Sequence, residues 1–146
     1  MDNRFSCAIH TLILIAKADE PMDSAEIAIS VGTNASYIRK ILGSLKNAGL
    51  IASRQGKKGF ILLKDPQALS LDDLLQALYP QGISLFPVHK NPNPLCPVGR
   101  HIKPVLGSLN DALQQQVFEG LKEMTLQDCM DQMLRALQAE SSMQDL

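Results

Sequence analysis

The sequence has few cysteines and no long apolar run, and both absences limit where the protein can work. Its three cysteines, Cys7, Cys96 and Cys129, are odd in number and far apart, which excludes the framework of a disulfide-stapled secreted domain. No apolar stretch reaches the roughly 20 residues that span a bilayer. Asp2 and His10 do not fit a signal peptide. We therefore expect a cytoplasmic protein with reduced thiols and no membrane partner.

Aromatic residues are also scarce, at 4%, and tryptophan is absent. Any core must therefore pack mainly with Leu, Ile, Val, Ala and Met. Apolar residues nevertheless make up 45% of the chain and charged residues 20%, which excludes global disorder. A length of 146 residues fits one domain, or one small domain with a helical appendage.

Acidic residues are missing from one long segment. No Asp or Glu lies between Glu26 and Asp65, while seven of the fourteen bases do. The rest of the chain holds the other seven bases and all fifteen acids. This asymmetry indicates a polyanion partner for one face, although a solvated surface is the alternative. The seven bases are Arg39, Lys40, Lys46, Arg54, Lys57, Lys58 and Lys64.

Helical periodicity predicts three helices in the first third of the chain. Asp23, with Glu26 three residues later, forms a box-like cap for the second helix, and Asn34 or Thr33 caps the third. The expected ranges are 5–18, 23–32 and 33–50.

A β-hairpin is expected next, with apolar strands over 50–53 and 60–63 and a tip rich in glycine and lysine. A further helix follows, capped by Ser70 with Asp73. These elements occur in the order of a winged helix-turn-helix domain, which we assign to residues 1–79.

The C-terminal half begins with a proline-rich connecting loop over 80–98. A long helix is expected over about 99–121, beginning or kinking at Pro104. Thr125 with Asp128 caps a last helix over 126–139. We expect 99–139 to be dimerisation helices and 140–146 to be a frayed tail.

The third helix has the features of a DNA-recognition helix. A helix fits the major groove of B-DNA, and the residues of its first turns reach base edges. Ser36, Tyr37, Arg39 and Lys40 lie where such contacts are made. Tyr37 could instead simply cover the start of the helix.

The hairpin tip supplies three further candidates for contacts with double-stranded DNA. Arg54, Lys57 and Lys58 could reach the backbone or the minor groove, while Gly56 and Gly59 permit the turn. Lysines at a hairpin tip can also serve only for solubility. Together with the acid-free segment, however, these signals favour DNA binding.

The run EIAISVGTNASYIRKILGSLKNAGLIASRQGKKGFILLKDPQALSLDDLLQAL resembles the Rrf-two family of winged helix-turn-helix transcription regulators, typified by IscR, NsrR and CymR. The likeness lies in the Leu-x-x-Leu-x-x-Ala-Gly-Leu ending at 42–50, the glycine-rich wing at 54–60 and the helix at 71–78. It implies a mainly α fold with a small β-hairpin. It also implies a dimer paired through its long C-terminal helix on a roughly two-fold symmetric operator. Lys58 stands where many members have glycine.

The apolar pattern also favours a homodimer. The C-terminal helices carry more apolar surface than a lone appended helix could bury in so small a domain. The alternative is that this stripe packs back on its own domain. The stripe comprises Ile102, Leu106, Leu109, Leu113, Val117, Leu126, Met130, Met133 and Leu137.

Cys96 is the only cysteine of the connecting loop, where many members of the family hold an iron–sulfur cluster with three cysteines. One thiolate cannot hold a cluster that takes four ligands, and a zinc site with His89 and His101 would need a fourth ligand. We therefore expect no cofactor and no metal.

Arg100, His101 and the helix start place positive charge near Cys96, which favours a redox-sensing thiolate. A structural role at the helix entry is the alternative.

The sequence thus favours a homodimeric DNA-binding transcription regulator that acts as a repressor, and it leaves both a redox-sensing and a structural role open for Cys96. The alternative is a protein-binding adaptor that uses the winged helix only as a scaffold. No nucleophile–base pair, metal motif or phosphate loop indicates an enzyme. The sequence does not specify the effector.

Overall fold

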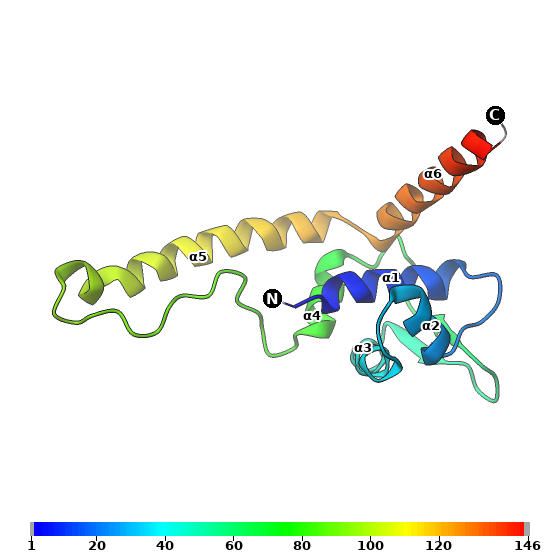
Figure 1. Cartoon of the computed structure of the whole chain (residues 1–146), viewed down its shortest axis with the longest axis horizontal. Coiled ribbons are helices and arrows are strands. Elements are labelled where there is room, and N and C mark those ends of the chain that lie inside the picture. The colour runs from blue at the N-terminus through cyan, green and yellow to red at the C-terminus, as the bar shows by residue number, and fades with distance from the viewer. Residues whose placement is uncertain (1, 145–146) are drawn as a thin grey trace.

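The computed structural model describes residues 2–144 and confirms the expected fold class. Four helices and a two-stranded antiparallel hairpin form a compact body, from which two C-terminal helices extend in different directions (Figure 1). The elements are α1 (Arg4–Lys17), α2 (Ser24–Val31), α3 (Ala35–Asn47), β1 (Ile51–Ser53), β2 (Phe60–Leu62), α4 (Leu71–Leu78), α5 (Pro97–Glu123) and α6 (Leu126–Gln144).

Short-range hydrogen bonds fix the helix starts of the body. The side chains of Asp23 and Asn34 accept from backbone N–H groups at the starts of α2 and α3. Ser70 and Asp73 form a full capping box on α4. Each side-chain acceptor satisfies a backbone donor that the helix cannot use itself. These caps lie where the sequence predicts them.

The core lies between α1, α2, α3, α4 and β1, and it also takes in the beginning of α6. Leu126 is fully buried and Met130 nearly so, which corrects their expected place in an interface stripe. Backbone hydrogen bonds hold this junction, because Leu71 N donates to Met124 O over 2.8 Å and Leu126 N to Leu69 O over 2.9 Å. The buried residues of the core include Ala8, Leu12, Ile27, Ile38, Ile41, Leu42, Leu45, Ile51, Leu69 and Leu74.

The hairpin forms the wing of the domain. Ile51 pairs with Leu62 and Ser53 with Phe60. Gly59 has a positive φ of 105°, and a Cβ there would lie 2.6 Å from Pro21 Cβ. Glycine is therefore required where the wing packs against the segment between α1 and α2.

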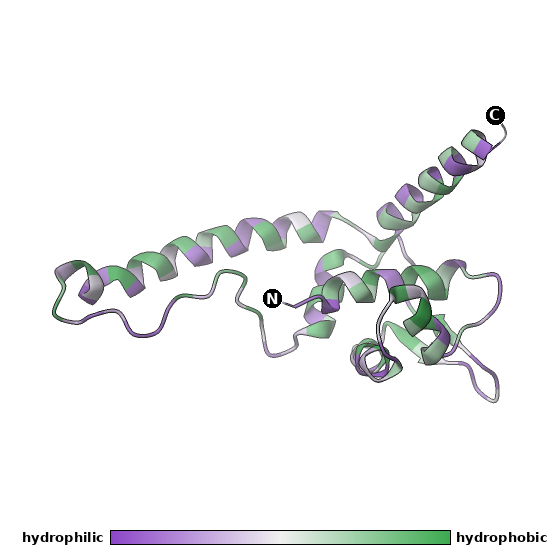
Figure 2. Cartoon of the chain, in the orientation of Figure 1, coloured by the Kyte–Doolittle hydropathy of each residue, from purple (hydrophilic) through white to green (hydrophobic). Residues whose placement is uncertain are grey.

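The long helix α5 packs against α4 and otherwise extends away from the body (Figure 1). It begins at Pro97, two residues before the expected start, because proline suits the first helical position. It continues through Pro104, and none of its residues is buried. Figure 2 shows apolar and polar residues alternating along it, and the connection to α4 runs back beneath it.

The last helix is longer than expected. α6 continues to Gln144, so 140–144 is helical and not a frayed tail. No glycine or proline follows Gly120, so nothing in the sequence terminates this helix early. The expected tail residues 145–146 lie outside the described residues.

Candidate nucleic-acid interface

The outer face of α3 is polar, basic and accessible. Its inner face buries four apolar residues, which turns Ser36, Arg39 and Lys40 outward, where all three are exposed. Asn34 fixes the first turn by accepting from Tyr37 N over 2.8 Å. The first two turns of α3 can therefore offer a hydroxyl and two cationic side chains to an approaching groove. The buried residues of α3 are Ile38, Ile41, Leu42 and Leu45.

Tyr37 is oriented differently from its neighbours. Its side chain is half-buried, and its hydroxyl donates to Asn3 Oδ1 over 2.6 Å. Burial, followed by the charge of Asp2, raises the pKa of Tyr37. The structure thus directs the side chain of Tyr37 toward the beginning of α1, whereas Ser36, Arg39 and Lys40 point outward.

The three bases of the wing are not equivalent. Arg54 Nη1 donates to Lys58 O over 3.2 Å, so it braces the tip from inside. The ammonium group of Lys58 forms an ion pair with Glu26 of α2, and this hydrogen bond raises the pKa of Lys58. Lys57 is exposed, and no acid among residues 2–144 pairs with it. Lys57 is therefore the wing base most available to a phosphate.

Two acids from outside the acid-free segment form ion pairs with its bases. Glu26 pairs with Lys58, and Asp73 with Lys64 over 2.9 Å. Lys46 lies over the ring of Phe60, 5.1 Å from its centroid. Within residues 2–144 the bases of this segment that remain exposed without an ion pair or an aromatic partner are Arg39, Lys40 and Lys57.

Sequence reasoning missed Asn3 and the bracing role of Arg54. The bond between Asn3 and Tyr37 joins residues 34 positions apart, so no local pattern announces it. The sequence did single out Glu26, but for a different role. Its position suits a capping box, yet its side chain binds Lys58 and not the cap backbone. Glu26 and Lys58 are far apart in the sequence, so no local pattern predicts their ion pair.

Cys96 is exposed at the N-cap of α5, and its side chain makes no capping hydrogen bond. The loop is held by other groups. Cys96 N donates to Asn93 O over 3.2 Å, and a Cβ on Gly99 would lie 2.4 Å from that same oxygen. The thiol itself therefore has no visible structural task.

The other cysteines are less accessible. Cys7 is buried and Cys129 half-buried, and burial raises the pKa of both thiols. The histidines near Cys96 do not complete a site: His101 Nδ1 lies 2.8 Å from Pro97 O. Within residues 2–144, no three or more His, Cys, Asp or Glu side chains converge in a group that could hold a metal ion.

None of the helices in residues 2–144 is long and apolar enough to cross a membrane. On the body, the exposed bases without an acidic partner among residues 2–144 lie on the first two turns of α3 (Arg39 and Lys40) and at the tip of the wing (Lys57). Figure 1 shows both on the side of the body that faces away from α5 and α6.

Comparison with known proteins agrees with this geometry. The model of the Rrf2 (Rrf-two) family, described as iron-dependent transcriptional regulators, matches residues 1–132. The chain is 39% identical over 131 residues to YwnA of Bacillus subtilis, which is provisionally assigned as an HTH-type transcriptional regulator. That alignment covers 90% of this chain and 97% of YwnA.

Two solved structures show the same fold. One, provisionally assigned as a DNA binding protein, is 35% identical with a TM-score of 0.70 and covers 87% of this chain and 98% of its own. The other, provisionally assigned as a transcriptional regulator of Lactobacillus plantarum, is 26% identical with a TM-score of 0.74. It covers 97% of this chain and 99% of its own.

The family description names iron, but the described side chains do not fit an iron site, since Cys96 has no second cysteine near it and no ligand group forms. The family consists of regulators and not of enzymes. By the match of its sequence along most of its length, the chain belongs to the Rrf2 family of DNA-binding transcriptional regulators.

Proposed function

We propose that the chain is a cytoplasmic homodimeric repressor that places α3 in the major groove of a roughly two-fold symmetric operator. The observation that carries the proposal is the acid-free outer face of α3, where Arg39 and Lys40 are exposed beside Ser36. Arginine and lysine donate to guanine edges and phosphates, and a hydroxyl can serve either base or backbone. Ser36, Arg39 and Lys40 are therefore assigned to base edges and adjacent phosphates.

The wing is assigned to the DNA backbone. Lys57 makes this contact, because its ammonium group is exposed and unpaired within residues 2–144. Arg54 and Lys58 shape the tip, and Lys58 reaches DNA only if its pair with Glu26 opens. Tyr37 contributes through its position at the helix start.

Pairing of two chains is assigned to α5. Val105, Leu109, Leu113 and Val117 form a row with a spacing of four residues, and they are 61%, 55%, 38% and 40% exposed. Such a row is one ridge of a helix, which can pack into the groove of a second helix. Large apolar side chains left this accessible along one helix mark an association surface. Residues 1–79 thus read DNA, 80–98 connect, and 99–139 pair, with the beginning of α6 shared with the body.

Cys96 is assigned the role of the redox-sensing thiol. It is exposed, lies at the junction of the connection and α5, and has no capping bond to lose. A peroxide would oxidise its thiolate to a sulfenate while the peroxide is reduced to water, placing a polar group at the helix entry. Cys96→Ser should abolish a peroxide response and spare DNA binding by the reduced protein. A response that persists in this variant removes Cys96 from the proposal.

Salt dependence and charge reversal test DNA binding directly. A protein with about 6–10 phosphate contacts loses roughly 10³–10⁵-fold in affinity between 50 and 200 mM salt. Arg39→Glu and Lys57→Glu should each weaken binding to DNA from the chain's own promoter region. Lys90→Glu, in the connection, is the matched control with the same change of charge. Equal behaviour of all three variants would leave the protein-binding adaptor as the better description.

A further inference from the structure

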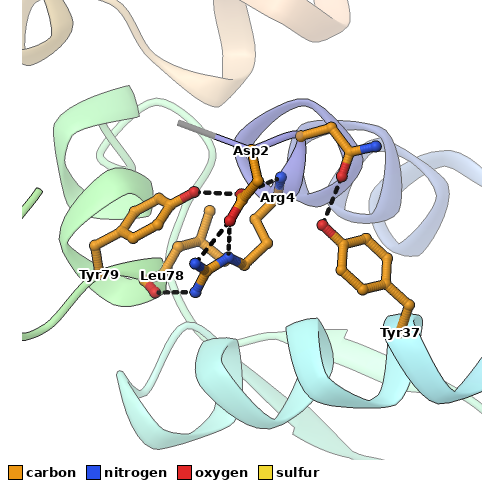
Figure 3. Close-up of polar contacts among 6 residues, drawn as sticks. Asp2, Arg4, Tyr37, Leu78 and Tyr79 are labelled. Carbon is orange, nitrogen blue, oxygen red and sulfur yellow. Dashed lines mark hydrogen bonds and ion pairs between the residues drawn. The ribbon is translucent and has the colours of Figure 1, made fainter. Parts of the chain in front are cut away.

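The chain has two tyrosines, and both bind the same short segment. Tyr37, in the first turn of α3, donates its hydroxyl to Asn3 Oδ1 over 2.6 Å. Tyr79, at the C-cap of α4, donates to Asp2 Oδ1 over 2.5 Å. Residues 2–4, which we call the N-terminal strap, therefore connect the beginning of one helix with the end of another (Figure 3).

Hydrogen bonds and a cation–π contact join the residues of the N-terminal strap to one another and to Tyr79. Arg4 donates to Asp2 Oδ2 from Nε over 2.9 Å and from Nη2 over 2.7 Å, and its guanidinium carbon lies 4.3 Å from the centroid of the Tyr79 ring. The hydrogen bond from Arg4, followed by that from Tyr79, holds the pKa of Asp2 well below its usual range. Burial and the bond to Asp2 raise the pKa of Tyr79 to about 12. These groups act as one charge-assisted cluster.

The cluster is too accessible to stabilise the fold strongly. The side chains of Asp2 and Arg4 are 46% and 40% exposed, and ion pairs at that exposure contribute little to folding. The apolar underside of α3 already attaches that helix to the core, but apolar contacts have little directionality. A short hydrogen bond at Tyr37 is directional, and Tyr37 lies beside Ser36 and two residues before Arg39.

We propose that the N-terminal strap is a positioning device for DNA reading, in which Asn3 and Tyr37 fix the first turn of α3 relative to the end of α4. The inference rests on the proposed function, because positioning matters only if α3 reads DNA. Asn3, Asp2, Arg4 and Tyr79 are positioning residues that do not touch the DNA. Tyr79 is also the C-cap of α4, so the same cluster holds the point where the connection toward α5 begins.

Affinity for two duplexes tests the device with the full chain. The first duplex is selected by the wild-type protein from a random pool, and the second is a scrambled duplex of equal length. Asn3→Ala, Tyr37→Phe and Tyr79→Phe each remove one hydrogen bond. Each should weaken binding to the selected duplex by about 5–10-fold, the equivalent of roughly one hydrogen bond. Binding to the scrambled duplex should change by less than about 2-fold, since phosphate contacts remain.

The double variant Asn3→Ala/Tyr37→Phe separates positioning from direct contact. If the two groups act through each other, the double variant binds as well as either single variant. Additive losses would assign the Tyr37 hydroxyl to the DNA and overturn the proposal. Equal losses on both duplexes, or no loss, would also overturn it. Gln76→Ala is the matched control, because it removes a surface side-chain hydrogen bond of α4 outside the cluster.

A measurement without DNA keeps the two proposals apart. With ¹³C-labelled tyrosine the protein gives two ring signals, one for each tyrosine. In Tyr79→Phe the remaining signal, from Tyr37, should shift if the cluster is continuous. An unshifted signal would reject the N-terminal strap even if DNA binding is intact. If the wild type selects no duplex, the proposed function fails, and this signal still decides whether the cluster exists.

Discussion

The helices α3 and α5 are both amphipathic, but they complete their packing in different ways. α3 buries Ile38, Ile41, Leu42 and Leu45 within its own chain over 13 residues. α5 is 27 residues long and buries none, although Leu109 and its neighbours along the ridge are as apolar as the residues under α3. The body, together with the beginning of α6, buries its apolar residues within one chain, whereas the apolar ridge of α5 stays exposed.

This difference fits the two tasks proposed for the chain. DNA reading by α3 would need a fixed angle, which a buried core and capped helix starts provide. Pairing through α5 would need its apolar ridge to remain available until another copy arrives. Concentration dependence is the physical property that distinguishes them, since burial inside one chain does not depend on concentration and burial between chains does.

The largest effect is expected at the base of α6. Leu126 is fully buried in the core of the body, although it belongs to a C-terminal helix. Leu126→Ala removes buried methyl groups and leaves a cavity, which should lower the free energy of unfolding by about 2–5 kcal/mol. Urea denaturation at two protein concentrations measures this. A loss that disappears at high concentration would move Leu126 to the interface between chains.

The second largest effect should appear in the dimer Kd and not in the stability of the single chain. Leu109→Asp places a carboxylate on the exposed ridge of α5, and a charge in the middle of an interface should raise the dimer Kd by about 30-fold or more, or ~2 kcal/mol. Sedimentation at several concentrations gives the Kd. Ser108→Asp, exposed on the same helix but off the ridge, is the matched control and should leave the Kd unchanged. A monomeric wild type would refute the pairing role of α5.

A third prediction tests whether the wing bases differ as the structure indicates. Lys57→Ala should reduce the slope of log affinity against log salt by about 1, because one phosphate contact is lost. Lys58→Ala should leave the slope nearly unchanged, since its ammonium group is already paired with Glu26. Fluorescence anisotropy across a salt series compares the two neighbouring lysines directly. Equal slopes for both variants would show that the pair with Glu26 opens on DNA.

The sequence predicts what is local in this fold and misses what is distant. Asp23, Asn34, Ser70 and Thr125 cap helices as their spacing indicates, because a cap and its helix are adjacent in the chain. The burial of Leu126 was missed. Periodicity identifies an apolar face but does not say which surface covers it.

In the candidate site, too, local features can be predicted from the sequence and distant contacts cannot. The acid-free segment locates a run of bases in the sequence, but counting charge could not show that Glu26 and Asp73 form ion pairs with two of them. Asn3 could not be found from the recognition helix alone, because it contacts Tyr37 across 34 residues. The sequence thus suggested the candidate face, and the structure distinguished exposed bases from bases already engaged.

The smallest effect is expected from pH at the start of α4, on the self-contained side of the molecule. Burial alone would raise the pKa of Asp73, but the hydrogen bonds from Lys64 and Ser70 and the charge of Lys64 outweigh it and hold the pKa below its usual value. A carboxyl of this kind stabilises the fold above its unfolded pKa and loses that contribution as pH falls through its folded pKa. Asp73→Asn should therefore lower the stability at neutral pH by less than about 1 kcal/mol, as for other accessible pairs. The difference from wild type should shrink below about pH 4.

Denaturation between pH 7 and 3 checks this, with Asp111→Asn on α5 as the control that should show no such difference. A deficit that stays constant down to pH 3 would mean that the geometry of the cap matters and its charge does not.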